Sequence, residues 1–291
     1  MTHSLRWGTH SLSLEEPLVM GIVNATPNSF FDGGRYASSS TSIARADELI
    51  AQGARALDFG GCSTQPGAVP PTLEEEWKRV EPAIQHCAMH HPNILLSIDT
   101  YRGEIVHRAA QEGIGLVNDI SAGRMDPTML PVVAHWDLPY VLMHMQGTPA
   151  TMQLHPTYEN VTKEVLAFLQ TKHAELHSLG VRVACIDLGF GFGKTREHNF
   201  TLLRHLADFH ALELPLLVGI SRKSMIYKSL NTTVEKSLNG TSALHAWALD
   251  RGAKILRVHD VTEAIEVVRL HQSLMRDATL SGSSPIADTP Q

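Results

Sequence analysis

Residues 18–34 read LVMGIVNATPNSFFDGG. The first six are apolar and rich in β-branched side chains, a pattern typical of a strand buried on both faces. The following residues supply amide, hydroxyl and carboxylate groups together with proline and glycine, instead of a compact turn. A long polar segment at the carboxyl end of a buried strand is typical of a ligand-binding loop in a parallel α/β protein.

The same alternation of a short β-rich run with a longer helical pattern continues along the chain, which predicts repeated βα units. Eight such units predict a single (β/α)8 TIM barrel. A doubly wound open sheet is the alternative, although it normally uses fewer strands. The predicted strands are residues 18–24, 56–61, 94–100, 116–120, 140–146, 184–190, 215–221 and 254–260.

The domain boundaries follow from this pattern. We expect a lead-in over residues 1–17, the catalytic barrel over 18–277 and a disordered tail over 278–291, because the tail is rich in Ser, Gly and Pro. A chain of 291 residues is long enough for one barrel of this kind.

Composition excludes several classes of protein. A formal net charge of -6 and a pI near 6.3 argue against a general nucleic-acid binder, which needs clustered Lys and Arg. No apolar run reaches the length of a membrane span, and residues 1–21 contain no apolar h-region followed by a small-residue cleavage site, so we expect no signal peptide there. Three cysteines without CxxC spacing predict free thiols in a reducing compartment, so we expect a soluble cytoplasmic protein.

A polar residue lies at or just beyond the carboxyl end of every predicted strand. In a parallel barrel these ends share one face, where the catalytic groups of this architecture lie. Any one of them could instead cap a helix or satisfy a turn. Eight together predict a polar ligand, because unpaired polar groups are costly to desolvate. The eight residues are Asn24, Asp58, Asp99, Asn118, His144, Asp187, Ser221 and His259.

Two motifs at the seventh and eighth strands predict an anion site. SRKS (221–224) carries two cations and two hydroxyls, and RVHD (257–260) carries a cation, an imidazole and a carboxylate. Barrels often bind phosphate at these two strand ends. Each motif alone could be a solvated loop, but their pairing favours an anionic substrate group.

A second cluster, Asp99, Asn118 and Asp187, offers several hydrogen-bond acceptors and one amide that also donates. Such a set suits a planar aminated heterocycle that resembles guanine or pterin. From the residues alone, we therefore expect a barrel enzyme that joins such a heterocycle to an anionic leaving group.

Other motifs have weaker functional interpretations. GFGFGKT (189–195) is not a phosphate-binding P-loop, because Leu188 stands where the first glycine is required. Two pairs of histidines have the i,i+4 spacing of metal ligands but fall within predicted helices, away from the strand ends, and we expect them on the solvated surface. These pairs are His86 with His90 and His173 with His177.

The ordered set of motifs resembles the dihydropteroate synthases over residues 18–270. The motifs are MGIVNATPNSF, LDFGGCSTQPGA, SIDTYR, VNDISAG, LMHMQGTP, DLGFGFGK, LVGISRKSM and RGAKILRVHD. The resemblance implies a (β/α)8 barrel that condenses hydroxymethyl-dihydropterin pyrophosphate with para-aminobenzoate, giving dihydropteroate and pyrophosphate. It also implies Mg²⁺ as cofactor and a homodimer, with no nucleic-acid or membrane partner.

The resemblance also implies residue roles. The pterin pocket is Asp99, Asn118, Asp187 and Lys223, with Asp58 at its floor. Arg257 and His259 hold the pyrophosphate, and the metal ligand is Asn24. The residues with implied catalytic roles are Asp99, Asp187, Lys223, Arg257 and His259; those with implied substrate-binding roles are Asp58, Asn118, Met143, Thr64, Gln65, Pro66, Phe192, Ser224, Thr26 and Asp32.

The implied mechanism is mainly electrostatic: pyrophosphate leaves first, and the aromatic amine attacks a resonance-stabilised pterin methylene cation. Cationic groups would stabilise the leaving oxygens, while the carboxylates would favour the electron-poor pterin. Closure of the first two loops would exclude water.

Four positions depart from the family pattern. Asn28, Cys62 and Gln65 replace two acids and an arginine, and Leu188 replaces a proline. Glutamine lacks the charge and the donor fork of arginine, so loop closure, aminobenzoate handling and sulfonamide sensitivity are the properties in question. Two alternatives follow: a pterin-binding methyltransferase barrel, and a pterin-binding protein whose synthase activity is reduced or lost.

Overall fold

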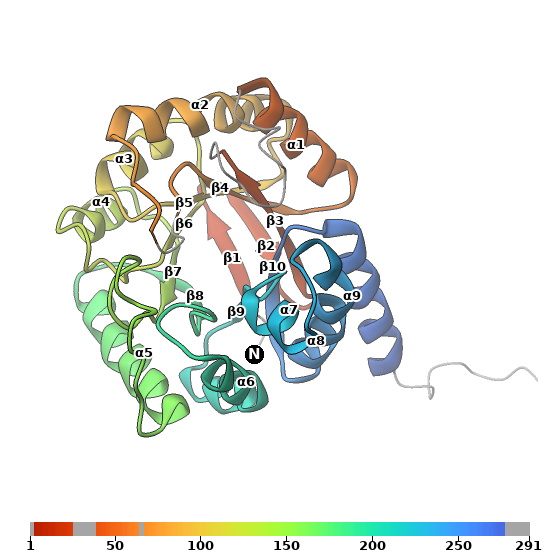
Figure 1. Cartoon of the computed structure of the whole chain (residues 1–291). Coiled ribbons are helices and arrows are strands. Elements are labelled where there is room, and N and C mark those ends of the chain that lie inside the picture. The colour runs from red at the N-terminus through yellow and green to blue at the C-terminus, as the bar shows by residue number, and fades with distance from the viewer. Residues whose placement is uncertain (1–2, 26–38, 64–66, 277–291) are drawn as a thin grey trace, which may run out of the picture.

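Eight parallel strands close into a barrel in this computed structural model, which describes residues 3–25, 39–63 and 67–276. The strands lie in the centre and the helices form an outer ring (Figure 1). The predicted TIM barrel is confirmed, and the open-sheet alternative is wrong because the last strand pairs with the first. Around the barrel the strands are β10 (Ala253–Val258), β3 (Leu18–Asn24), β4 (Ala56–Gly60), β5 (Leu95–Asp99), β6 (Leu116–Asp119), β7 (Tyr140–Met143), β8 (Val183–Asp187) and β9 (Leu216–Val218).

The helices pack their apolar faces against the outward side chains of the strands, which buries a continuous core. They are α1 (Ser39–Ala51), α2 (Leu73–His90), α3 (Gly103–Gln111), α4 (Met129–His135), α5 (Val161–Ser178), α6 (Arg196–Arg204), α7 (Ser224–Ser229), α8 (Leu238–Asp250) and α9 (Val261–Met275), with 3₁₀ segments η1 (Leu206–Leu212) and η2 (Glu235–Ser237). Within the described ranges, no helix is long and apolar enough to cross a membrane.

Alternate residues of each strand face the barrel interior. Near the strand starts these residues form one apolar cluster, which includes Met20, Ala56, Leu95, Leu116, Val141, Cys185, Leu217 and Ile255. Because side chains alternate along a strand, the next inward positions lie two residues further on. Those positions are Ile22, Asp58, Ser97, Asn118, Met143, Asp187, Gly219 and Arg257. The barrel is therefore filled with apolar side chains at one end and lined largely with polar ones toward the other.

An antiparallel hairpin of β1 (Ser4–Trp7) and β2 (His10–Ser13) covers the amino end of the barrel. Leu5 and Leu12 belong to the same buried cluster as the lower interior residues. Trp7 packs so closely on Gly115 that a Cβ there would come within 2.4 Å of the indole. The sequence pattern predicts residues 1–17 only as a lead-in and does not predict this hairpin. The predicted tail, 278–291, lies outside the described residues.

The end of β7 differs from the predicted strand. The prediction extended it through residues 140–146, but the strand stops at Met143. His144 and its successors leave the sheet and enter the loop before α5. This difference affects which side chains face the barrel mouth, which is the opening of the barrel at the carboxyl ends of its strands.

Candidate active site

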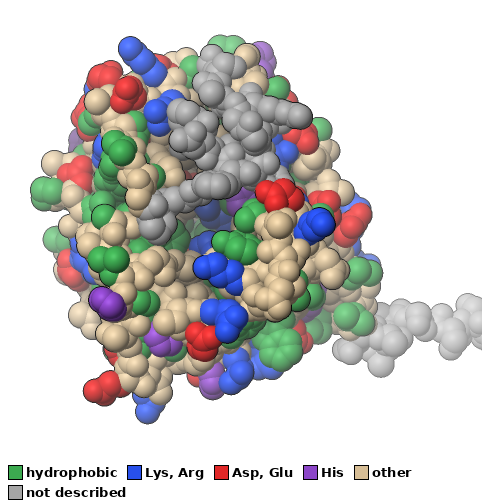
Figure 2. Space-filling model, in the orientation of Figure 1, with side chains coloured by type: hydrophobic (Ala, Val, Ile, Leu, Met, Phe, Trp, Pro, Cys, Tyr) green, Lys and Arg blue, Asp and Glu red, His purple; other side chains and the backbone are tan. Residues whose placement is uncertain are grey.

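Arg257 is the centre of an ion-pair network inside the barrel mouth. Its Nε donates to Asp58 Oδ2 at 2.6 Å, and its Nη2 donates to Asp99 Oδ2 at 2.6 Å. Asn118 Nδ2 donates to the same oxygen of Asp58 at 2.8 Å. These four side chains come from β10, β4, β5 and β6, so barrel closure brings them together. In Figure 2, Lys and Arg side chains also lie near the middle of the viewed face.

Burial governs the charges of this network. Desolvation raises the pKa of Asp99 to about 7; Asp58 adds to this rise, and Arg257 opposes it. The two carboxylates hold the pKa of Arg257 above its ordinary value despite burial, so the guanidinium stays charged. Asp58 is fully buried, and its Oδ1 has no hydrogen-bond partner among the described residues. An acceptor in that state favours a ligand that donates a hydrogen bond.

Lys223 reaches back across the mouth from the start of α7. Its Nζ donates to the carbonyl oxygen of Phe190 and lies 4.7 Å from the ring centre of Phe192. Burial lowers the pKa of Lys223 to about 8, and the nearby Asp187 carboxylate opposes that shift. The stem of Lys223 also packs 3.4 Å from the place where a Cβ on Gly191 would lie. Lys223 thus packs over a loop that carries both an apolar ring and a tight glycine turn.

An apolar wall faces these charges. Met143, the inward residue at the end of β7, clusters with Ile120, Met145 and Met152, and Phe192 packs against the same group. Methionine and aromatic side chains adapt to flat ligands. The wall therefore suits one face of a planar ring.

Asp187 at the end of β8 turns its carboxylate toward the following glycine loop. Its Oδ1 accepts from the Gly189 backbone N–H at 2.7 Å. Burial raises the pKa of Asp187, while Lys223 lowers it. Asp187 therefore holds the glycine loop and lies near the Lys223 ammonium group at the barrel mouth.

Lys194 is a buried residue beside the site that the sequence interpretation missed. Its side chain is 2% exposed, and its Nζ lies 2.9 Å from His144 Nδ1 and 3.0 Å from the carbonyl oxygens of Gly189 and Phe192. Burial lowers the pKa of Lys194 to about 7, and its one amino group links several parts of the GFGFGK loop. The rejected P-loop motif contained this lysine, and its place at the end of a glycine run was the available signal.

The expectation that His144 joins the polar ring is wrong. Its imidazole packs edge-on against Phe168 of α5, with ring centres 4.9 Å apart, and hydrogen-bonds Lys194. Because Met143 is the inward residue of β7, its neighbour His144 faces the helices. Burial, with Lys194 nearby, lowers the pKa of His144 to about 2, so the imidazole is neutral.

The ends of β9 and β10 are linked through His259. Its Nδ1 lies 3.1 Å from Ser221 Oγ, and its backbone N–H donates to the same oxygen at 3.2 Å. Next to this pair, Arg222 makes two 2.8 Å bonds to the Asp260 carboxylate. Burial, with Arg257 beside it, lowers the pKa of His259 to about 3. Of the two cations in SRKS, Lys223 lies at the mouth, while Arg222 is engaged with Asp260.

Asn24 at the end of β3 offers a neutral oxygen near the Asp99 carboxylate. The strand between them carries Gly60, and a Cβ on that residue would lie 3.8 Å from Asn24 Oδ1 and 3.7 Å from Asp99 Oδ2. Glycine therefore places no side chain beside the two oxygens. An amide oxygen in such a position fits Mg²⁺, which binds through few protein oxygens and retains other ligands.

A buried acid of α2, the helix that follows the second loop, holds the start of the third βα loop. Glu76 of α2 accepts from Thr100 Oγ1 at 2.6 Å and from Arg102 Nη1 at 2.8 Å. Cys62, one of the departures from the family pattern, is half-buried with its Sγ 3.7 Å from the Tyr101 hydroxyl. Burial raises the pKa of the Cys62 thiol, so it packs as a neutral group.

The structure thus brings together many of the predicted site residues. Ser224, the first residue of α7, is exposed beside Lys223. Five predicted substrate-binding residues lie outside the described residues: Thr26, Asp32, Thr64, Gln65 and Pro66. Two of the departures, Asn28 and Gln65, also lie there, whereas Leu188 is fully buried in the core.

Known proteins resemble the chain in sequence and fold. A family model described as "Pterin binding enzyme" matches residues 20–259. The dihydropteroate synthase of Escherichia coli (strain K12) is 42% identical over 267 residues, which cover 91% of this chain and 94% of that protein.

Two solved structures have the same fold. The Yersinia pestis dihydropteroate synthase with a sulfonamide drug complex matches with a TM-score of 0.89 and 38% identity, over 93% of this chain and 98% of that one. The Xanthomonas albilineans enzyme with 4-aminobenzoic acid matches with a TM-score of 0.87 and 38% identity, over 94% and 98%.

Proposed function

The chain belongs to the dihydropteroate synthase family of pterin-binding enzymes, and from this premise we propose how its residues divide the work. The reaction joins 6-hydroxymethyl-7,8-dihydropterin pyrophosphate to para-aminobenzoate and releases pyrophosphate. The single observation that carries the assignment of roles is the Arg257 guanidinium, held between Asp58 and Asp99 at the barrel mouth.

The pterin lies in the polar part of the mouth. Asp99, Asn118 and Asp187 supply acceptors and one amide for the edge of the heterocycle, and the unpartnered Oδ1 of Asp58 supplies another acceptor at the floor. Met143 covers one face of the ring from the apolar wall. Buried acceptors of this kind discriminate strongly against a ligand that lacks matching donors.

The leaving group lies near Arg257 and His259. When the C–O bond breaks, its electron pair goes to the pyrophosphate oxygen, and the pterin methylene carbon becomes a cation. Arg257 stabilises the growing negative charge without reorganising, because two carboxylates already hold it in place. His259 is neutral, and its Nδ1 is hydrogen-bonded to Ser221 Oγ.

Aminobenzoate then attacks the cation through the lone pair of its amine nitrogen, and as the new C–N bond forms that nitrogen gives one proton to the released pyrophosphate. Phe192 and the stem of Lys223 flank the aromatic ring, and Ser224 binds near the carboxylate. The contact of Lys223 with the Phe192 ring supports this assignment. Thr26, Asp32, Thr64, Gln65 and Pro66 complete the site from the first two loops.

Asn24 is the protein ligand for Mg²⁺, and the space beside Gly60 supports that role. When bound, Mg²⁺ supplies positive charge to the phosphate oxygens. The protein contributes the neutral amide oxygen and keeps the Asp99 carboxylate engaged with Arg257.

The homodimer and the cytoplasmic location are also proposals. A hollow between α6 and α8, lined by Phe200, Leu203, Arg204, Leu244 and Trp247, supports a self-association surface. Trp247 is 44% exposed and adjoins the apolar side chains that line this hollow, so the two together offer an apolar patch for a partner subunit. Three free thiols support a reducing compartment.

One assay tests the function against both alternatives. The purified protein is mixed with dihydropterin pyrophosphate, para-aminobenzoate and Mg²⁺, and dihydropteroate and pyrophosphate are measured together. We expect equal amounts of the two products. Pterin binding without product would instead identify an inactive binding protein, and methyl transfer to a corrinoid with no pyrophosphate release would identify the methyltransferase.

A further inference from the structure

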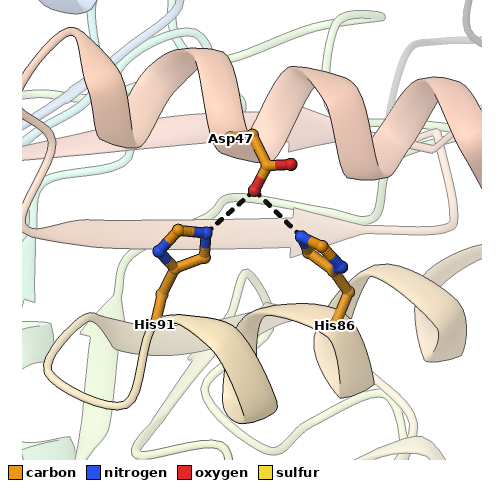
Figure 3. Close-up of side chains that lie close together, drawn as sticks. All are labelled: Asp47, His86 and His91. Carbon is orange, nitrogen blue, oxygen red and sulfur yellow. Dashed lines mark hydrogen bonds and ion pairs between the residues drawn. The ribbon is translucent and has the colours of Figure 1, made fainter.

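Asp47, His86 and His91 form a compact group on the outside of the barrel. Asp47 points from α1 toward two imidazoles that rise from α2 and its C-terminal end (Figure 3). One carboxylate oxygen, Oδ1, lies 3.0 Å from His86 Nε2 and 2.9 Å from His91 Nε2. The three ligand-type atoms all lie within 4.8 Å of one another.

We propose that these three residues form a structural binding site for a divalent transition metal of the zinc class. Two imidazoles and one carboxylate are a ligand set that such metals prefer, whereas Mg²⁺ prefers oxygen ligands alone. The site is therefore chemically distinct from the Asn24 site at the barrel mouth. It would join α1 to α2, the helices that follow the first two loops.

Two of the three ligand pairs are already near the spacing of a metal site. Two ligand atoms at about 2.1 Å from a tetrahedral metal lie about 3.4 Å apart, so the pairs of Asp47 with His86 and with His91, at 3.0 and 2.9 Å, must separate by about 0.4 to 0.5 Å. The two Nε2 atoms, which lie within 4.8 Å of each other, must take up the same spacing. Both histidines present the same atom, Nε2. In the metal-free protein each Nε2 donates its proton to Asp47 Oδ1, because an ionised carboxylate only accepts hydrogen bonds. On metal binding each Nε2 loses that proton, and a neutral imidazole with its proton on Nδ1 offers the Nε2 lone pair.

Backbone hydrogen bonds fix the position of His91, and both imidazoles are hydrogen-bonded to Asp47 before binding. The backbone N–H of His91 donates to the Cys87 carbonyl oxygen at 2.8 Å, which ends α2, and the His91 carbonyl accepts from Ile94 at 3.0 Å. The side chains of Asp47, His86 and His91 are 44%, 25% and 28% exposed. This exposure leaves a path for the ion and room for water as a fourth ligand.

His90 provides a matched control on the same helix. Its ring centre lies 4.7 Å from that of His86, yet it does not contact Asp47. His86 and His90 have the i,i+4 spacing of metal ligands and are expected from the sequence on the solvated surface, but the fold places His91, not His90, beside His86 at Asp47. The ligand pair joins His86 to His91, because the end of α2 turns the next residue toward α1.

The test uses full-length protein without a polyhistidine tag, at constant excess Mg²⁺. Zn²⁺ is titrated by calorimetry, Co²⁺ binding is followed by its visible absorption, and melting temperature is measured with and without added Zn²⁺. We expect one Zn²⁺ per chain at this site, a tetrahedral Co²⁺ spectrum, and a higher melting temperature with Zn²⁺.

His86→Ala, His91→Ala and Asp47→Asn should each weaken Zn²⁺ binding at least about tenfold and abolish the thermal shift, whereas His90→Ala should change neither. Melting without Zn²⁺ verifies that each variant is folded. Unchanged Zn²⁺ binding in the three ligand variants, or an equal loss in His90→Ala, would overturn the assignment, as would the absence of a Co²⁺ spectrum in the parent protein.

Discussion

Asp58 and Arg257 lie 199 positions apart in the chain, yet they form a 2.6 Å ion pair inside the barrel. Asp58 is fully buried, while 18% of the Arg257 side chain is exposed toward the mouth. Asp58, together with Asp99, therefore holds the guanidinium in place and leaves part of it accessible to a ligand.

Replacing Arg257 by Ala should lower kcat by about a hundredfold while free pterin binding weakens by only about threefold. The reason is that the partner charge of Arg257 grows in the transition state. Steady-state kinetics and calorimetric titration with pterin measure the two quantities. Arg257→Lys keeps the positive charge but loses the planar, bidentate arrangement of donors, so it should recover only part of the rate. Equal losses in rate and binding for Arg257→Ala would contradict the role.

The rate should depend on pH through Asp99. Its pKa is raised to about 7, so the carboxylate that pairs with Arg257 is protonated below that pH and ionised above it. We expect kcat/KM to rise about tenfold per pH unit below pH 7 and to level off above it. Measurements from pH 5.5 to 8.5 test this. Asp99→Asn should be slower, and its kcat/KM should not rise with pH below pH 7. A rise that persists in this variant would show that another group titrates there.

Lys194→Met should destabilise the glycine loop. The substitution leaves several buried acceptors without their donor, which should cost about 3 kcal/mol. The melting temperature should fall by about 6–12 °C. Lys163→Met, at an exposed position of α5, is the matched control and should change it by no more than about 2 °C. A Lys194 variant as stable as the control would show that the loop does not depend on this ammonium group.

Leu5→Ala should test the hairpin that closes the amino end of the barrel. Leu5 is 1% exposed within the interior cluster, so truncation should cost about 2–5 kcal/mol. Leu270→Ala removes the same atoms from a side chain that is 67% exposed on α9 and should cost under about 0.5 kcal/mol. Urea unfolding measures both. Equal small effects would mean that the hairpin adds little to stability.

Trp247→Asp should weaken the proposed dimer, because it places a charge in the hollow between α6 and α8. Light scattering after size-exclusion chromatography should show a shift from dimer toward monomer as protein concentration falls. Leu179 is an exposed apolar residue outside this hollow and serves as the control. Leu179→Asp should leave the measured mass unchanged. A dimer that persists in Trp247→Asp would place the interface elsewhere.

Local pattern determined much of the fold. The apolar run at residues 18–23 predicted a buried strand, and repetition of that unit predicted the barrel because eight βα units are enough to close one. The polar residues at the strand ends were visible for the same reason, since carboxyl ends of parallel strands share one face. Asp58, Asp99 and Asn118 could be proposed for one face before any contact was known, whereas Arg257 was assigned to an anion site and its ion pairs with Asp58 and Asp99 came only from the structure.

Tertiary structure decided the contacts that depend on facing and distance. Met143 ends β7 facing inward, so His144 faces α5 and hydrogen-bonds Lys194, although both histidine and lysine could have been placed at the mouth. Likewise, His91 rather than His90 joins His86 at Asp47, because packing of α1 on α2 selects one side of the helix end. Sequence spacing constrains neighbours within one element, whereas pairs between elements are set by strand register, helix packing and barrel closure.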